Sequence, residues 1–358
     1  MNSTLLQNAW CRQLNLKWPL IQAPMGGLTT AELVATVSNT GALGSLGGAY
    51  LAPELLEQTI KSIQQRTTKA FGVNLFAPTP SPKLSPAQIT AALNATQGYR
   101  NELALAPPVV QAPFDEHFDE QFAIVLNYKP AVFSFTFGLL SKELIKECRQ
   151  QQIMTLGTAT TLEEGMILQE YGVDAVIAQG AEAGGHRGSF SAEQQDSLIG
   201  TLVLTRMLVH ALTIPVIASG GIMDGAGIAA VLMLGAQAAQ LGTAFLLCPE
   251  TASSAAYRAA LSKAQGQDTQ LTRAFSGRWA RGLKNRFMIE MGQHDLSILP
   301  FPAQNAFTRD IRKKAAELGR AEFLSLWAGQ GVGLIRQMHA QDLLHTLYEE
   351  TVRALEKS

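Results

Sequence analysis

Short apolar runs alternate along the chain with longer segments in which apolar residues recur every three or four positions. Apolar runs that end in Gly, Asn, Ser or Thr are typical of buried parallel strands, and the helical periods between them are typical of crossover helices. The pattern predicts eight strands, which are Pro19–Ala23, Ala42–Ser45, Ala70–Leu75, Ala131–Phe135, Ile153–Gly157, Asp174–Ala178, Pro215–Ser219 and Ala238–Leu241.

The number of strands decides the fold class. Eight units between Pro19 and Leu247 leave roughly 29 residues for each strand and its helix, which suits a closed (β/α)8 TIM barrel. A doubly wound open sheet more often has about five to seven strands. We therefore expect an α/β protein built on a TIM barrel, with its reacting groups at the carboxyl ends of the strands.

Helix start signals fall between the predicted strands. A Ser, Thr or Asp at the N-cap accepts a hydrogen bond from the first helical turn, and a Glu three positions later strengthens the signal. The expected caps and helices are Thr29 before Ala31–Ser38, Ser141 before Lys142–Gln150, Thr161 with Glu164 before Met166–Tyr171, and Asp224 before Ala226–Leu234.

The chain divides into a barrel and two smaller parts. Residues 1–248 are expected to form the barrel, whose third crossover is lengthened by a proline-rich excursion over about 78–130. Residues 249–320 are expected to form a helical cap, and residues 321–358 to form helices that pack back on the barrel. Helical patterns occur at Ala87–Leu105 in the excursion and at Ser253–Ala264 and Arg309–Gly319 in the cap.

Composition narrows the possible partners. The chain has 28 Lys and Arg against 29 Asp and Glu, a formal net charge of −1 and no long basic run, so neither nucleic acid nor a membrane is expected as a partner. Three widely spaced cysteines indicate neither a disulfide framework nor a metal site. The amino terminus lacks the apolar stretch of a signal peptide, so we expect a soluble cytoplasmic protein, and the oligomeric state stays open.

Glycine turns follow the seventh and eighth predicted strands and lead toward helices. Backbone N–H groups at helix starts bind phosphate, and in many barrels these two loops form one phosphate site. Each glycine alone can simply permit a tight turn, but the pair favours a phosphate site. The expected binding residues are Ser219, Gly220, Gly221, Gln240, Leu241, Gly242 and Thr243.

A phosphate at that place commonly belongs to flavin mononucleotide (FMN), whose ring system would then lie across the mouth of the barrel. The first strand runs into Ala23, Pro24 and Met25, followed by two glycines that let the main chain pass close to a flat ring. The third strand ends near Asn74, whose amide can donate and accept at a flavin edge. The alternatives are an ordinary proline turn and a turn-capping Asn.

The segment after the sixth strand is the most informative, because four glycines surround one imidazole there. Gln179 can hydrogen-bond a flavin edge, and Gly184 and Gly185 can present N–H groups to ligand oxygens. His186 would project into the barrel mouth as a base or an anion binder, although a single loop histidine elsewhere is more often a surface residue.

Several motifs together resemble the class I nitronate monooxygenases, formerly called 2-nitropropane dioxygenases. The resemblance runs from about Pro19 to Thr243 and resumes near Leu326, while the region around 249–300 is weakly covered. The motifs are QAPM at 22–25, FGVN at 71–74, FSFTFG at 133–138, AQGAEAGGHRG at 178–188, ASGGI at 218–222, QLGT at 240–243 and LWAGQG at 326–331.

The resemblance implies a cofactor, a reaction and a catalytic residue. It implies FMN held by Met25, Asn74, Gln179, Gly184, Gly221 and residues 240–243, with His186 as the catalytic residue. The family oxidises alkyl nitronates, propionate 3-nitronate among them, with O₂ to a carbonyl product and nitrite. Because a nitronate is already an anion, His186 is expected to bind its oxygens, and to act as a base only toward a neutral nitroalkane.

Substrate contacts are expected from the fourth strand and the cap. Ser134 lies in the aromatic segment that ends the fourth strand, and such a segment is otherwise typical of barrel core. Phe301 of the cap would supply an apolar wall. The cap cations Arg278, Lys284 and Arg286 are candidates for a substrate lid, but their pattern is more typical of a solvated basic face.

Two other functions remain open from the sequence. An NAD(P)H-dependent flavin reductase, of the enoyl-carrier-protein reductase or quinone reductase type, would share the barrel and much of the glycine-histidine loop. A flavin-binding or phosphate-binding module without activity is the third reading, in which His186 would have no task.

Overall fold

A computed structural model of the chain describes residues 5–191 and 197–357; the first four residues of the predicted barrel part and the last residue of the C-terminal part lie outside it. Eight parallel strands form one sheet in the order β1-β9-β8-β6-β5-β4-β3-β2. A parallel bridge between Ile21 and Leu43 joins the two end strands and closes the barrel. The strands are β1 (Leu20–Gln22), β2 (Gly44–Gly47), β3 (Phe71–Phe76), β4 (Val132–Thr136), β5 (Met154–Ala159), β6 (Ala175–Gln179), β8 (Val216–Ser219) and β9 (Ala238–Leu241).

The predicted fold class is confirmed, since each of the eight predicted strands overlaps one barrel strand. Their burial explains why the pattern is so clear. Strands β2, β5, β8 and β9 are buried along their whole length, because helices cover the outer face and side chains fill the inside. At the amino ends of the strands, Trp10 and Leu14 of the helix α2 (Ala9–Leu14) pack into the core with Ile21 and Leu156.

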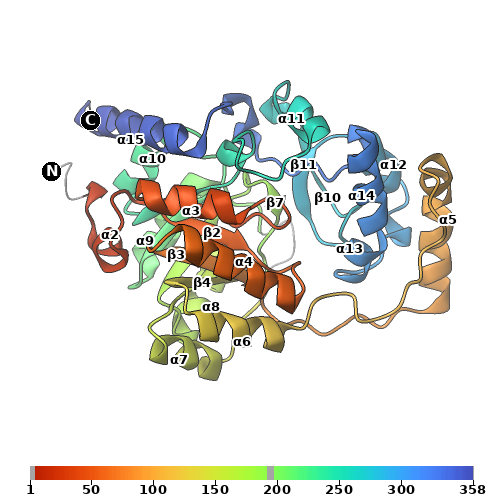
Figure 1. The fold of residues 1–358 in the computed structure, drawn as a ribbon, viewed down its shortest axis with the longest axis horizontal. Coiled ribbons are helices and arrows are strands. Elements are labelled where there is room, and N and C mark those ends of the chain that lie inside the picture. The colour runs from red at the N-terminus through yellow and green to blue at the C-terminus, as the bar shows by residue number, and fades with distance from the viewer. Residues whose placement is uncertain (1–4, 192–196, 358) are drawn as a thin grey trace.

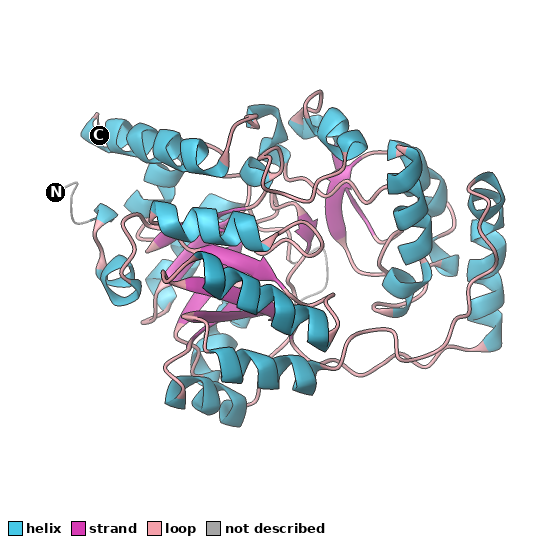
Figure 2. Ribbon diagram, viewed as in Figure 1, coloured by secondary structure: helices cyan, strands magenta, loops and turns pink. Residues whose placement is uncertain are grey.

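Helices surround the sheet (Figure 2) and begin where their caps predict, with one exception. The N-cap of α3 is Thr30, whose side chain accepts a hydrogen bond from Leu33, and not Thr29 as expected. Thr29 instead donates to the Met25 carbonyl and accepts from the Gly47 amide, so it ties the first strand loop to β2. The helices are α3 (Ala31–Thr40), α4 (Pro53–Arg66), α6 (Phe118–Tyr128), α7 (Lys142–Gln150), α8 (Leu162–Tyr171), α9 (Thr201–Ala211) and α10 (Gly225–Met233).

The cap contains a small antiparallel sheet that the sequence analysis did not predict. Its central strand β11 (Ala280–Leu283) pairs with β10 (Thr269–Thr272) on one side and with β7 (Gly185–His186) on the other, and β7 belongs to the loop after β6. A two-residue strand with a glycine has no alternating pattern to detect. Around it lie α11 (Ala255–Leu261), α12 (Arg286–Gly292), α13 (Ala303–Phe307), α14 (Arg309–Leu318) and the short 3-10 helices η1 (Thr243–Phe245), η2 (Gly266–Asp268), η3 (Asp295–Ser297), η4 (Ala321–Phe323) and η5 (Gln330–Leu334).

The excursion after β3 crosses from the barrel to the cap. It carries α5 (Pro86–Glu102), which stands beside the cap helices at the end of two extended segments (Figure 1). Arg100 of α5 is almost fully buried and contacts both carboxylate oxygens of Asp310 in α14, at 2.6 and 3.3 Å. The excursion is therefore part of the cap in space, although the barrel surrounds it in sequence.

The last helix, α15 (Ala340–Glu356), lies against α10 and α3 on the outside of the barrel. Its buried residues Leu343, Leu344 and Leu347 join the same core as Leu33 and Leu232. Among the helices that the structure describes, none is both long and apolar enough to cross a membrane.

Candidate active site

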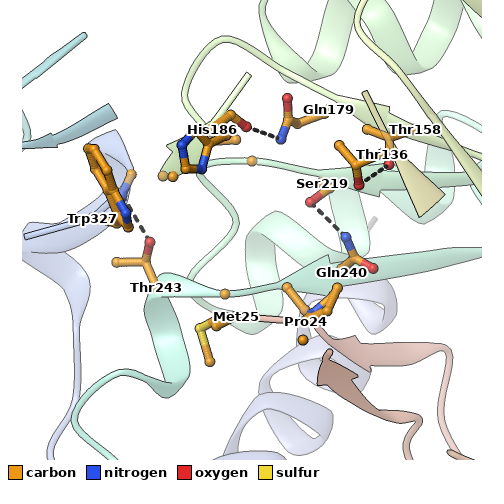
Figure 3. A pocket seen from close by; sticks show the side chains of 18 of the residues that line it. Pro24, Met25, Thr136, Thr158, Gln179, His186, Ser219, Gln240, Thr243 and Trp327 are labelled. Atoms are coloured by element: carbon orange, nitrogen blue, oxygen red, sulfur yellow. Dashed lines mark hydrogen bonds between the residues drawn. The ribbon is translucent and has the colours of Figure 1, made fainter. Parts of the chain in front are cut away.

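A cavity lies at the carboxyl ends of the barrel strands, facing the segment that leads into η5 (Figure 3). Most of the residues expected at a cofactor or catalytic site line this one cavity, although they come from five different strand ends and the short strand β7. These are Ala23, Pro24, Met25, Asn74, Gln179, Gly184, Gly185, His186, Ser219, Gly220, Gly221, Gln240, Gly242 and Thr243.

Two loops of the cavity have backbone conformations or contacts that require glycine. Gly220 and Gly221 follow β8 with φ angles of 118° and 69°, in the left-handed region. A Cβ atom on Gly184 would lie 2.5 Å from the backbone nitrogen of Gly329, so these two segments touch through their main chains. Backbone atoms therefore form much of the cavity wall.

Three predicted residues do not line this cavity. Leu241 is 2% exposed and packs in the core, because its side chain points away from the barrel mouth. Ser134 is buried behind Asn74 and accepts a hydrogen bond from the Asn74 amide at 2.9 Å, so it orients that amide. Phe301 lines a second cavity next to the first, and its ring centroid lies 6.1 Å from that of His186.

The cap sheet and one cap serine fix the position of His186. Its strand β7 pairs with β11, and its Nε2 lies 2.8 Å from the Ser276 hydroxyl oxygen. That hydroxyl donates to the Arg278 carbonyl oxygen at 3.0 Å. The serine oxygen therefore accepts from Nε2–H, and Nδ1 is the unprotonated ring nitrogen.

The surroundings of His186 are aromatic and positively charged. Ring centroids of Phe137 and Trp327 lie 5.7 and 5.4 Å from that of the imidazole. Burial, followed by the cations of Arg278 and Arg312, lowers the pKa of His186 to about 3. At neutral pH the imidazole is therefore uncharged, and the positive charge near it comes from arginine.

A family model described as nitronate monooxygenase matches residues 8–350. The chain belongs to the nitronate monooxygenase family. A probable nitronate monooxygenase of Staphylococcus haemolyticus is 42% identical to it over 346 residues, which is 96% of each chain. Membership makes the protein a flavin-dependent oxidoreductase, as the sequence motifs predicted.

Solved structures extend the comparison to the fold. Nitroalkane oxidase of Streptomyces ansochromogenes has a TM-score of 0.92 and 37% identity, with 98% of this chain and 99% of that chain covered. FabK of Thermotoga maritima has a TM-score of 0.76 and 26% identity, with 97% and 96% covered. The fold of this chain is thus shared with both proteins over nearly its whole length.

No role of its own was expected for Phe137 from the sequence, and Arg278 was named there only together with Lys284 and Arg286. Phe137 lies at the end of β4 with a φ angle of 77°, unusual for an aromatic residue, and Arg278 lies 4.0 Å from its ring centroid. Arg278 is held by the Ser189 carbonyl, whereas Lys284 and Arg286 are exposed, as a solvated basic face requires. The FSFTFG motif was a signal for Phe137; nothing local distinguishes Arg278 from its neighbours.

A second cavity adjoins the first at Ala49, Tyr50 and Phe76, which line both. The Tyr50 hydroxyl is buried and has no hydrogen-bond partner among the residues that the structure describes. Burial raises the pKa of Tyr50 to about 12, so the hydroxyl keeps its proton. Arg309 and the buried Asn305 also line this second cavity.

The lowered pKa of His186 predicts a pH dependence of stability. Between about pH 3 and the ordinary value of 6.5, the unfolded chain binds a proton at this imidazole that the folded chain does not. The free energy of unfolding should therefore fall as the pH falls through this window. His186→Gln should reduce that slope by up to about 1.4 kcal/mol per pH unit, measured by denaturant unfolding from pH 7 to 4. Identical slopes for both proteins would contradict a neutral buried imidazole.

Proposed function

We propose that this protein uses FMN and O₂ to oxidise alkyl nitronates to a carbonyl product and nitrite. The observation that carries the proposal is the neutral His186, enclosed by aromatic rings and near arginine cations, at the edge of a cavity with glycine-rich walls. An uncharged imidazole beside arginines suits an anionic substrate better than one that must first lose a proton.

The cavity fits an FMN molecule by its chemistry. The loops at Gly220–Gly221 and Gly242–Thr243 line the cavity after β8 and β9, where their backbone N–H groups favour a phosphate. Asn74, Gln179 and Gln240 supply amides along the wall, as the polar edge of a flavin requires. When bound, FMN would accept electrons from the substrate and pass them to O₂.

The remaining steps belong to side chains of this chain. Arg278 and Arg312 attract the nitronate anion and disfavour a proton on His186. The imidazole keeps Nε2–H on Ser276 and leaves Nδ1 as an acceptor, so it can take a proton from a neutral nitroalkane, whereas the oxygens of a nitronate depend on the arginines and not, as the sequence led us to expect, on His186. Phe137 and Trp327 exclude water around the ring, which strengthens these electrostatic interactions.

Release of the flavin and steady-state turnover test the proposal. The purified protein should be yellow and release FMN, not FAD, on denaturation, because the two phosphate loops serve one phosphate. It should consume O₂ and form nitrite from an alkyl nitronate. Under anaerobic conditions the nitronate should bleach the flavin and NADPH should not. Bleaching by NADPH alone would make the protein a reductase, and a colourless protein that cannot be reconstituted with FMN would remove the basis of the proposal.

The second cavity favours propionate 3-nitronate as a substrate, because its carboxylate needs a polar partner away from the reacting nitronate. Asp115 and Glu116 line this cavity and oppose an anion. The Arg309 cation and the Tyr50 hydroxyl, which has no partner among the described residues, also lie there and can bind the carboxylate. Arg309→Met should therefore raise KM for propionate 3-nitronate about tenfold and leave KM for ethyl nitronate within about twofold. Steady-state nitrite release with both substrates measures the two ratios.

A cation one turn further along α14 provides the control. Lys313 is exposed and lines neither cavity, so Lys313→Met removes the same charge from the same helix without touching the site. KM for propionate 3-nitronate should not change in this variant. Equal effects of the two substitutions, or equal effects of Arg309→Met on both substrates, would show that the second cavity does not bind the carboxylate.

A further inference from the structure

We propose that the Gln179 amide is fixed as a hydrogen-bond donor toward the cavity and thereby strengthens binding of reduced FMN over oxidised FMN. Arg187 is the positioning residue that sets this orientation. The inference rests on the proposed use of FMN. A contact between Gln179 and the flavin was already expected, and the new element is its effect on the midpoint potential of the cofactor.

Three hydrogen bonds determine which way the Gln179 amide faces. Its oxygen accepts from the Gly188 backbone N–H at 2.7 Å and from Arg187 Nη1 at 3.0 Å. Its nitrogen donates to the His186 carbonyl oxygen at 2.9 Å. Two of these partners can only donate and the third can only accept, so exchanging the amide oxygen and nitrogen would break all three bonds.

Arg187 cannot easily follow a rotation of that amide, because its guanidinium is held by main-chain oxygens. Arg187 is 2% exposed, and its Nη1 also donates to the Gly180 carbonyl at 2.6 Å. Its Nη2 donates to the carbonyls of Gln179 and Ser197, at 3.1 and 2.6 Å. The guanidinium thus lies in a cradle of carbonyl groups and directs one N–H at the Gln179 side chain.

The remaining N–H of Gln179 has no partner assigned by this network. Gln179 lines the cavity, and Figure 3 shows its amide nitrogen toward His186 and its amide oxygen at the opposite end of the amide. Gln240, across the cavity, has a weaker constraint: its nitrogen lies 3.4 Å from the Ser219 hydroxyl. Gln179 is therefore presented as a donor, whereas Gln240 is held by one long contact.

A fixed donor distinguishes the two oxidation states of a flavin. Reduction adds two electrons to the ring system and makes its heteroatoms richer in negative charge, so a donor N–H binds the reduced form more strongly. Because the donor is oriented before the ligand binds, no reorganisation of the amide opposes the interaction. The ratio of the two dissociation constants, and hence the midpoint potential of bound FMN, should depend on Gln179.

Two substitutions at the same position test this effect. Gln179→Met keeps the length of the side chain and removes the donor, while Gln179→Glu replaces the donor by a carboxylate oxygen. In FMN-loaded protein, Gln179→Met should shift the ratio of dissociation constants at least about fivefold toward oxidised FMN. Gln179→Glu should shift it by at least about tenfold, which for a two-electron couple lowers the midpoint potential by about 30 mV. Dye-coupled anaerobic reduction measures the potential without any turnover.

Gln240→Met is the matched control, because it removes an amide of the same size from the opposite wall. Its effect on the potential should be smaller than that of Gln179→Met. An unchanged potential in Gln179→Met, or an equal shift in both methionine variants, would overturn the role of Gln179. A shift in Gln179→Glu alone would show an effect of added charge, which also overturns it.

A measurement on the unsubstituted protein covers the case in which the variants do not retain FMN. In spectra of ¹⁵N-labelled protein, one glutamine side-chain NH₂ should change when FMN binds, with both protons moving downfield and becoming slow to exchange. The NH₂ groups of Gln22 and Gln121, which each donate to two carbonyl oxygens without the cofactor, should not change in this way. If no glutamine NH₂ behaves in this way, Gln179 does not donate to the cofactor. Failure of the unsubstituted protein to bind FMN at all would instead refute the proposed function.

Discussion

Gly221→Asp is expected to weaken FMN binding by at least about 10³-fold, so that the purified variant is colourless. The new carboxylate would lie in the loop after β8 where the phosphate is expected, and two such charges about 4 Å apart repel by about 4 kcal/mol at an effective dielectric constant near 20. Its Cβ would also lie 3.0 Å from the Cβ of Glu182. Fluorescence titration of the apoprotein with FMN measures the affinity.

Two further substitutions separate the effect of the new charge in Gly221→Asp from the effect of its side-chain size and from a general loss of stability. Gly221→Asn adds a side chain of the same size without the charge, and its loss of FMN affinity should be clearly smaller. Gly319→Asp places the same residue at a nearly identical φ angle of 68° in open space at the end of α14, and should leave FMN binding unchanged. Normal FMN occupancy in Gly221→Asp would refute the phosphate site after β8.

His186→Asn should lower kcat/KM for any neutral nitroalkane that the protein accepts by about 10²–10⁴-fold, and for an alkyl nitronate by much less. Only the nitroalkane must lose a proton from carbon, and general-base catalysis by a positioned side chain contributes in that range. The nitronate has lost that proton already. Because His186 is neutral and its free Nδ1 can only accept, it makes neither an ion pair nor a hydrogen bond to the acceptor oxygens of a nitronate, so its removal should cost that substrate little.

Nitrite release and O₂ uptake at matched pH give the two ratios. The sequence led us to expect that His186 binds the nitronate oxygens, whereas in the structure the positive charge near the ring belongs to Arg278 and Arg312. Equal losses on both substrates would rule out a base at His186. No loss on either would place His186 outside the reaction.

The barrel was predictable because its signals are local. Each strand is a short apolar run bounded by turn residues, and β9 has the predicted bounds, Ala238–Leu241. The glycine loop at Gly221 was predictable for the same reason, since its φ angle of 69° lies in a region that other residues avoid. Gly242 also lines the cavity, but its φ angle of −108° is open to other residues. The catalytic candidate His186 was identified from its glycine-rich surroundings in the sequence.

The cap side of the site depends on contacts between distant parts of the chain. Arg278 and Lys284 are six positions apart and look alike in sequence, yet Lys284 is exposed and Arg278 packs, partly buried, over the Phe137 ring. Leu241 and Thr243 stand in one motif, but the turn at Gly242 directs them to opposite sides of the barrel end. Such differences come from tertiary packing, which the periodic pattern of apolar and polar residues does not predict.

The pairing of β7 with β11 has a consequence for exchanging parts between relatives. His186 is a barrel residue by sequence, but a cap strand and the cap residue Ser276 hold its backbone and its ring. A chimera that joins this barrel to the cap of a relative would therefore replace the groups that hold His186, and the tautomer and the pKa of the imidazole would change with them. Cap and barrel must therefore be exchanged together, and a fusion point in the loop from β6 to β7 would separate His186 from its partners.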